Sequence, residues 1–164
     1  MSDAKVRICF VCLGNICRSP TAEGVFRKLV YDAGLDGHVT IDSAGTGAWH
    51  VGELPDARSS AAAKTRGYDL VHRARKFTAA DFDRFDLVLA MDRVNLRALR
   101  RHRPRDAARE GVLFLEHVGF EGLDEVPDPY YGGRRDFERV LDLARRGSAL
   151  LIERIVASRE DARA

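Results

Sequence analysis

The chain has 164 residues, of which 45% are hydrophobic and 32% are charged, and its formal net charge is +2. This composition is typical of a globular protein, and the length predicts a single domain over residues 1–164. The composition excludes an intrinsically disordered chain. The small net charge excludes a strong global field that would recruit nucleic acid or a membrane surface.

The hydropathy pattern and the cysteine count indicate where the protein works. No segment approaches the roughly 20 apolar residues of a membrane span, and the start, MSDAKVRICF, lacks the features of a signal peptide. Three cysteines, an odd number, do not fit the disulfide framework of a secreted protein. We therefore expect a cytoplasmic protein without membrane insertion, and export without a signal peptide stays open.

The first half of the chain alternates predicted strands and helices. Residues 6–12 are a continuous apolar run, which is typical of a strand buried on both faces. The next apolar residues have helical spacing and predict a helix that is capped by Ser19, carries Pro20 in its first turn and ends at Gly34. A second strand and a second helix are predicted at residues 39–45 and 55–67.

The second half continues with a buried strand, a short basic helix and another strand, at residues 85–92, 94–102 and 111–118. A long final helix has an apolar stripe from Phe137 to Ile155, although Gly147 within it costs about 1 kcal/mol relative to alanine. Strands that alternate with helices predict an α/β fold with an open, twisted parallel sheet of about four strands and helices on both faces. Such sheets bind ligands beyond the carboxyl ends of their strands, where residues 12–19 would lie.

The segment that follows the first strand, CLGNICRS, combines Cys12 and Arg18 in a C-x5-R pattern. The pattern alone is weak, but a loop that leaves a strand and enters a helix can form a phosphate-binding nest of backbone N–H groups. Asn15 is one of the few residue types that tolerate a left-handed backbone there. Such surroundings stabilise the thiolate form of a cysteine, and an arginine fork can hold two phosphoryl oxygens.

A second segment, PDPYYGG, supplies a carboxyl group within the predicted loop 119–133. A phenolate is a poor leaving group, so an enzyme that cleaves an aryl phosphate needs an acid to protonate it. Asp128 is the candidate for this acid, and Tyr130 and Tyr131 beside it could flank an aromatic substrate.

Four segments, VCLGNICRSP, SAGTGAWHVG, GYDLVHRAR and DPYYGG, occur in this order along nearly the whole chain. Together they resemble the family of low-molecular-weight protein tyrosine phosphatases. The resemblance implies that Cys12 is the nucleophile that forms a phosphocysteine intermediate. It further implies that Arg18 clamps the phosphate and that Asp128 acts as general acid and later as general base.

The resemblance also assigns the remaining site residues. It implies a phosphate-binding loop that contains Leu13, Gly14, Asn15, Ile16, Cys17 and Ser19, and aromatic walls formed by Trp49, Tyr130 and Tyr131. Ser19 would stabilise the departing thiolate, while Ser43 and His72 would support the loop together with Asn15. Cys17 would form a reversible disulfide with Cys12 that protects the nucleophile from further oxidation. The resemblance also implies a mechanism without a metal or a cofactor.

The expected partners follow from this assignment. The substrate is a protein that carries phosphotyrosine, with a tyrosine kinase of the same cell as one candidate, and phosphate or another oxyanion is the product or an inhibitor. The basic run at residues 97–110 is diluted by Asp106 and Glu110 and offers no aromatic stacking platform, so we expect no nucleic acid. We expect a monomer.

Three alternatives remain at this point. An arsenate reductase on the same fold relays a disulfide through further cysteines, and this chain has no cysteine after Cys17. A protein-arginine phosphatase typically has threonine where this chain has Ile16, whose apolar side chain suits a phenyl ring better. A non-catalytic phosphate-binding module would not need Cys12, Ser19 and Asp128 together.

Cys9 and Cys12 also form a C-x-x-C pattern, which in other proteins marks a redox or metal pair. Residues three apart on a strand face opposite sides of the sheet, so these two thiols should diverge. We therefore expect Cys9 to be a small buried hydrophobic residue.

Overall fold

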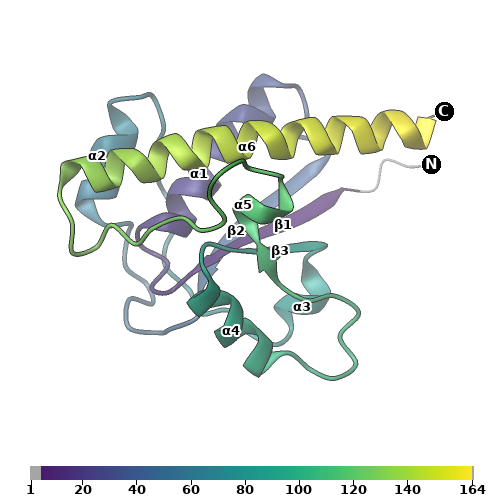
Figure 1. Ribbon diagram of the computed structural model, residues 1–164, viewed down its shortest axis with the longest axis horizontal. Coiled ribbons are helices and arrows are strands. Elements are labelled where there is room, and N and C mark those ends of the chain that lie inside the picture. The colour runs from purple at the N-terminus through teal and green to yellow at the C-terminus, as the bar shows by residue number, and fades with distance from the viewer. Residues whose placement is uncertain (1–4, 164) are drawn as a thin grey trace.

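The computed structural model describes residues 5–163. Residues 1–4, which begin the stretch without signal-peptide features, and residue 164 lie outside the described residues. The strands form one parallel sheet in the order β2-β1-β3-β4 (Figure 1), which confirms the predicted fold class. Their bounds are β1 (Val6–Cys12), β2 (Val39–Gly45), β3 (Leu87–Ala90) and β4 (Val112–Leu113).

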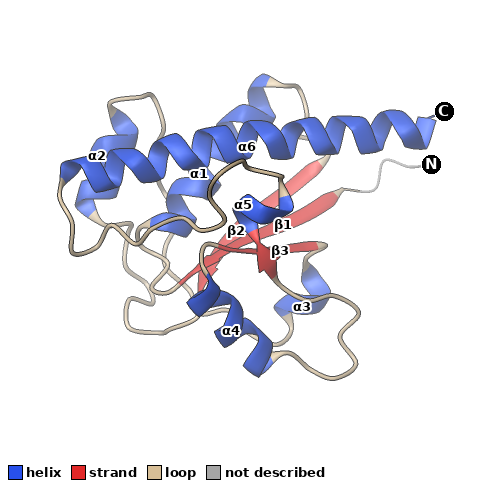
Figure 2. Ribbon diagram, in the orientation of Figure 1, coloured by secondary structure: helices blue, strands red, loops and turns tan. Residues whose placement is uncertain are grey.

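Helices cover both faces of this sheet, as Figure 2 shows. The helices are α1 (Arg18–Asp32), α2 (Ala57–Lys64), α3 (Asp81–Arg84), α4 (Arg93–His102), α5 (Phe114–His117) and α6 (Arg134–Arg163). Although α6 has 30 residues, the part of the chain that the structure describes has no helix long and apolar enough to span a membrane.

The period-two alternation of β1 creates two separate cores. Phe10 faces α1 and α6, and its ring packs edge-on against Phe26 and Phe114 with centroid distances of 5.7 and 5.2 Å. Cys9 and Val11 face the opposite side, which α3 and α4 cover. Cys9 therefore lies in one core and Cys12 in the other, as the strand geometry predicts.

The predicted strand at residues 111–118 is wrong over most of its length. Only Val112 and Leu113 pair with β3, and the chain then turns into α5. Phe114, Leu115 and Val118 are all buried, and their spacing fits a helix as well as a strand. Short apolar runs of this kind do not distinguish the two structures by periodicity.

Two other helices differ in detail from the expectation. Helix α2 is shorter than the predicted residues 55–67: it begins after Asp56, whose side chain accepts a hydrogen bond from the Arg58 backbone N–H, and it ends at Lys64, before Gly67 with φ of 85°. The cap position of α1 belongs to Cys17 rather than to Ser19, whose hydroxyl oxygen lies 3.0 Å from Cys12 Sγ. Gly34, with φ of 71°, follows the end of α1 as predicted.

Gly147 contributes to the packing of α6 on the sheet rather than merely weakening the helix. A Cβ atom at this position would lie 2.7 Å from Cζ of Phe114, which is fully buried against Phe10. Real Cβ atoms do not approach other atoms this closely. The absence of a side chain therefore allows α6 to pack closely against α5.

Whether Gly147→Ala raises or lowers the free energy of unfolding tests this packing. Without a clash, Gly147→Ala would stabilise α6 by about 1 kcal/mol, but overpacking of a filled core costs about 1–3 kcal/mol. We expect a net loss of about 1 kcal/mol in the free energy of unfolding, measured by urea denaturation. Ala149→Gly, at an exposed position of the same helix, calibrates helix propensity alone. A Gly147→Ala protein that is more stable than the wild type would contradict this packing.

Candidate active site

The loop between β1 and α1 lies at the carboxyl edge of the sheet, next to the point where the strand order changes direction. Strand β1 pairs with β2 on one side and β3 on the other, so the chain after Cys12 emerges at a topological switch point. The loop crosses directly over the end of β2. A Cβ at Gly45 would lie 2.8 Å from the Leu13 carbonyl oxygen, so only glycine permits this approach.

Asn15 determines the shape of this loop. Its backbone is left-handed, with φ of 58°, as predicted for this residue type. Its side-chain oxygen accepts a hydrogen bond from the Arg75 backbone N–H at 3.0 Å and lies 2.9 Å from Nε2 of His72. Because this oxygen can only accept, Nε2 of His72 carries a hydrogen and donates.

A continuous hydrogen-bond chain runs from Asn15 to the sulfur of Cys12. The Asn15 Nδ2 group donates to Ser19 Oγ at 2.8 Å and to Ser43 Oγ at 3.0 Å. Ser43 in turn donates to Glu23 Oε1 at 2.6 Å. Because Ser19 Oγ accepts from Asn15, its own hydrogen is left for another partner, and Cys12 Sγ at 3.0 Å lies nearer than the other available acceptor, the Ala44 carbonyl oxygen at 3.5 Å. The chain therefore supplies a hydrogen-bond donor to negative charge on this sulfur.

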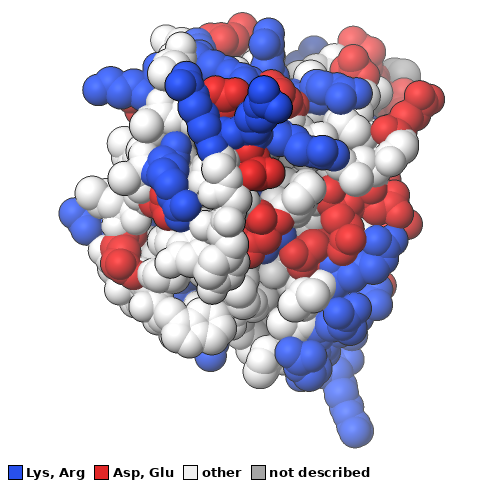
Figure 3. Space-filling view, turned by 60° about the vertical axis from the view of Figure 1, so that its left-hand side comes forward, with Lys and Arg blue, Asp and Glu red and all other residues white. Residues whose placement is uncertain are grey.

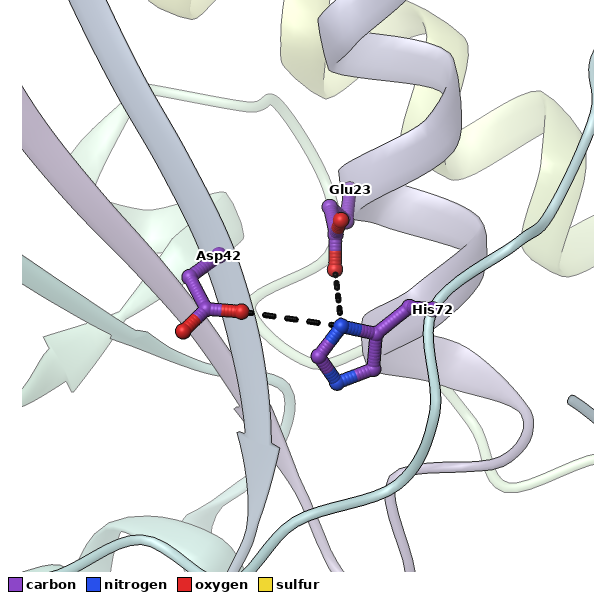
Figure 4. A group of neighbouring side chains, drawn as sticks. All are labelled: Glu23, Asp42 and His72. Carbon is purple, nitrogen blue, oxygen red and sulfur yellow. Dashed lines mark ion pairs between the residues drawn. The ribbon is translucent and has the colours of Figure 1, made fainter. Parts of the chain in front are cut away.

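Figure 4 shows the side chains of Glu23, Asp42 and His72 pointing toward one another. One potential ligand atom from each lies within 4.8 Å of the others. Nδ1 of His72 lies 3.3 Å from Glu23 and 3.6 Å from Asp42. The carboxylates also bind arginines: Glu23 accepts from Arg27 at 2.8 Å and Asp42 from Arg75 at 3.0 Å. Because these groups already hold Asn15 and Ser43 in place, we assign the cluster to support of the loop rather than to a metal.

Arg18 is 3% exposed and is held from two sides. Its Nη1 group donates to Asp92 at 2.5 Å and to the Val126 carbonyl oxygen at 3.0 Å, and Nη2 lies 3.7 Å from Asp128. Burial alone would lower the pKa of Arg18, but the negative charges of Cys12, Asp92 and Asp128 outweigh burial and raise it. The guanidinium therefore stays charged in a nearly dry position.

Asp128 belongs to a loop that is tied to α2. Its carboxylate accepts a hydrogen bond from the Tyr130 backbone N–H at 3.1 Å, while its side chain remains 42% exposed. The guanidinium of Arg58 donates to the Tyr130 carbonyl oxygen at 3.0 Å. The loop is therefore positioned, and its carboxyl group still faces an open space.

That space is a cavity of about 210 Å³, which we call the Cys12 cavity. Its walls are formed by Cys12, Leu13, Gly14, Ile16, Cys17, Arg18, Trp49, His50, Asp128, Tyr130 and Tyr131. Trp49 and Tyr131 are 72% and 95% exposed, so they form the rim rather than the floor. The side chains of Asn15, Ser19, Ser43 and His72 lie behind the loop and support it.

Several contributors to the site are absent from the sequence-based prediction, Asp42 and Arg75 of the loop support among them. Asp92 is the last residue of the predicted buried strand at residues 85–92, and this position alone indicates that it lies at the carboxyl edge of the sheet, near Cys12. His50 lines the cavity beside Trp49. Glu23 and Arg58 reach the site only through the packing of α1 and α2, which no local motif indicates.

Cys17 differs from Cys12 in its surroundings. It packs with Ile16, Ala74 and Phe137 and is 5% exposed, although it also borders the cavity. Burial raises the pKa of the Cys17 thiol to about 12, and a hydrogen bond with Ser59 offsets this only in part. Cys17 is therefore a neutral thiol at physiological pH.

Comparison with known proteins places this geometry in a family. A family model described as low molecular weight phosphotyrosine protein phosphatase matches residues 7–161. A protein of Streptomyces coelicolor named low molecular weight protein-tyrosine-phosphatase is 52% identical over 149 residues, which cover 89% of this chain and 91% of the relative. A human protein named low molecular weight phosphotyrosine protein phosphatase is 41% identical over 84% of this chain and 88% of its own.

Solved structures agree with these relatives. A protein tyrosine phosphatase from Entamoeba histolytica with Hepes in its active site superposes with a TM-score of 0.89, at 35% identity, over 94% of this chain and 99% of that chain. Wzb of Vibrio vulnificus in complex with benzylphosphonate superposes with a TM-score of 0.78, at 29% identity, over 91% and 98%. The chain therefore belongs to the family of low molecular weight phosphotyrosine protein phosphatases and is a hydrolase of that type.

Proposed function

We propose that the Cys12 cavity hydrolyses phosphotyrosine in proteins through a phosphocysteine intermediate. The observation that carries this proposal is that Cys12, Arg18 and Asp128 line one cavity, with Arg18 3.7 Å from Asp128 and Ser19 3.0 Å from the sulfur. One wall of a single cavity thus offers a nucleophile and a phosphate clamp, and the other wall offers an acid. The family assignment supports the same reaction.

In the first step, the Cys12 sulfur attacks phosphorus and the bond to the tyrosine oxygen breaks. Arg18 and the N-terminal end of α1 stabilise the charge on the equatorial oxygens. Asp128 donates its proton to the departing phenolate, so that tyrosine leaves as a neutral phenol. Most of the rate acceleration comes from charge stabilisation, because phosphoryl transfer needs little covalent assistance.

In the second step, Asp128 accepts a proton from water, which attacks the phosphocysteine, and the phosphorus–sulfur bond breaks. The Ser19 hydroxyl, oriented by Asn15, donates a hydrogen bond to the departing sulfur. Inorganic phosphate and the free Cys12 thiolate are the products. These steps need no metal and no cofactor.

The shape of the cavity favours an aryl substrate over the alternatives. Ile16 gives an apolar wall, and Tyr130 and Tyr131 pack edge-on at the mouth with their ring centroids 5.0 Å apart. The benzylphosphonate in the Vibrio vulnificus neighbour likewise carries a phenyl ring, attached to its phosphonate through a methylene group. The comparisons do not favour an arsenate reductase or a protein-arginine phosphatase.

We place the enzyme in the cytoplasm as a monomer that acts on phosphotyrosine proteins, with a tyrosine kinase of the same cell as one candidate. The mechanism needs a reduced Cys12, and cytoplasmic thiol systems keep cysteines reduced. Every group in the mechanism comes from one chain.

On the face shown in Figure 3, acidic side chains separate two groups of basic ones. This face therefore does not present a single sign of charge that would steer a charged partner toward it.

Substitution of Asp128 tests the proposed reaction. We expect Asp128→Ala to reduce kcat by about 10²–10⁴-fold for phosphotyrosine, whose leaving group needs a proton, and much less for an activated ester such as p-nitrophenyl phosphate. Steady-state assays in EDTA with a series of aryl phosphates measure this dependence. Cys12→Ser is the control, because loss of the nucleophile should abolish turnover of every ester. An equal loss for all leaving groups would remove Asp128 from this role.

We further propose that Cys17 protects the nucleophile. Peroxide oxidises the Cys12 thiolate to a sulfenic acid, the Cys17 sulfur attacks it, water leaves and a disulfide forms. The raised pKa of Cys17 means that Cys12, rather than Cys17, is the thiol that peroxide oxidises first. A thiol reductant then restores both cysteines.

Cys17→Ser tests this protection. After peroxide treatment and reduction with dithiothreitol, we expect the variant to recover less than half the fraction of its own initial activity that the wild type recovers. In the wild type, disulfide formation should accelerate with pH between 7 and 9, because the thiolate fraction of Cys17 grows about tenfold per unit below its pKa. Equal recovery in both proteins would count against the proposal, as would a rate that does not change with pH.

A further inference from the structure

A second cavity of about 410 Å³ lies between α2 and the first turns of α6, which Figure 1 shows side by side at one end of the molecule. We call it the α2–α6 cavity. Ala61 and Ala62 of α2 and the ring of Phe137 of α6 form its apolar walls. The two alanines carry the smallest side chains available at these positions, so the space between the helices stays hollow.

Arg58 lies between this cavity and the Cys12 cavity. Its guanidinium carbon lies 4.6 Å from the centroid of the Phe137 ring, which lines the α2–α6 cavity. The same atom lies 5.4 Å from the centroid of Tyr130, which lines the Cys12 cavity. Its Nη1 group also donates to the Tyr130 carbonyl oxygen at 3.0 Å. One side chain therefore separates two neighbouring cavities.

The Cys12 cavity is too small to select a protein substrate by itself. Its volume of about 210 Å³ is below the range of roughly 300–1,000 Å³ that is usual for small-molecule sites. It suits one phosphorylated ring, which every phosphotyrosine substrate presents. Discrimination between protein substrates then depends on contacts outside the Cys12 cavity. The α2–α6 cavity is a larger space next to it.

We propose that the α2–α6 cavity is a subsite that receives an apolar side chain of the phosphotyrosine substrate, from a residue close to the phosphotyrosine in sequence. The proposal rests on the proposed function, because it assigns a preference to the same reaction. The cavity adjoins the substrate cavity at Arg58 and Tyr130, so a substrate chain that leaves Cys12 past Tyr130 reaches it directly.

The charges at the rim favour an apolar occupant over an anionic one. Arg58 is paired with Asp56 at 2.9 Å, and Nε of Arg134 lies 3.1 Å from Glu138. Both guanidiniums that border the cavity are thus already neutralised, so an acidic side chain would gain little there. An aliphatic or aromatic side chain gains the burial of its apolar surface against Ala61, Ala62 and Phe137.

A set of phosphotyrosine peptides tests the subsite. In each peptide one of the three residues on either side of the phosphotyrosine is leucine and the others are alanine. We expect one position at which leucine raises kcat/KM about tenfold over the all-alanine peptide, as expected for partial burial of a leucine side chain. Ala61→Leu, at an exposed position that faces the cavity, should reduce this preference to less than twofold.

Three controls make the result specific. Ala61→Leu should leave kcat/KM for p-nitrophenyl phosphate unchanged, because that ester does not reach the subsite. Thr65→Leu, at the residue that directly follows α2 and also lines the cavity, should have the same effect. Ala157→Leu, at an exposed position near the end of α6, should keep the full preference.

Two results would overturn the subsite while leaving the proposed function intact. One is hydrolysis of all peptides at the same rate by the wild-type enzyme. The other is a leucine preference that survives both Ala61→Leu and Thr65→Leu, which would place the selective contact elsewhere, on the substrate-facing rim or on a second copy of the chain. If no phosphotyrosine peptide is hydrolysed, the proposed function itself fails and the subsite fails with it.

Discussion

The site depends on the orientation of one buried amide, that of Asn15. Its NH2 group donates to two serine hydroxyls, and its oxygen accepts from a histidine and a backbone N–H. All of its hydrogen-bonding capacity is therefore used, in a position that is 1% exposed. An unsatisfied polar group at this depth would cost about 1–3 kcal/mol, so the amide has one favourable orientation. That orientation makes the hydroxyl of Ser19 a donor toward Cys12.

The rest of the fold keeps this amide in place. Glu23 of α1 anchors Ser43 of β2, and His72 approaches from the segment between α2 and α3. Three parts of the chain that are distant in sequence thus meet behind a short loop. On the other side of Cys12, Asp92 at the end of β3 holds Arg18. Because the strands are parallel, their carboxyl ends meet at one edge of the sheet, and this edge brings the residues of the site together.

The fold class follows from the sequence, and local signals also indicate the loop between β1 and α1 and the loop that carries Asp128. A buried apolar strand followed by a turn and a helix is visible in residues 6–34, and Asn15 was expected to be left-handed. The two-residue strand β4 and helix α5 were missed because their apolar run fits either structure. Local spacing predicts Ser19 as the cap of the first helix, and only the resemblance to the phosphatase family predicts that its hydroxyl serves Cys12, beside which the structure places it.

Contacts that depend on how whole elements pack could not be predicted. Arg58 reaches Tyr130 only because α2 lies against the start of α6, and Gly147 is needed only because Phe114 comes within reach of α6. A single glycine in a predicted helix does not indicate which side chain from another element will pack against it. The role of Glu23 depends in the same way on its contact with Ser43 at 2.6 Å, between α1 and β2. Asp92 differs, because its position at the end of a predicted buried strand already indicates the carboxyl edge of the sheet.

The most direct test of this account is the activity of Asn15→Asp, which keeps the size and shape of the side chain but removes both of its N–H donors. We predict that kcat for p-nitrophenyl phosphate falls by about 10²-fold, since Ser19 loses the donor that orients its hydroxyl toward Cys12. Asn15→Gly, which tolerates the left-handed backbone, should lose activity as well. Turnover within twofold of the wild type in a folded Asn15→Asp enzyme would contradict the central role of this amide.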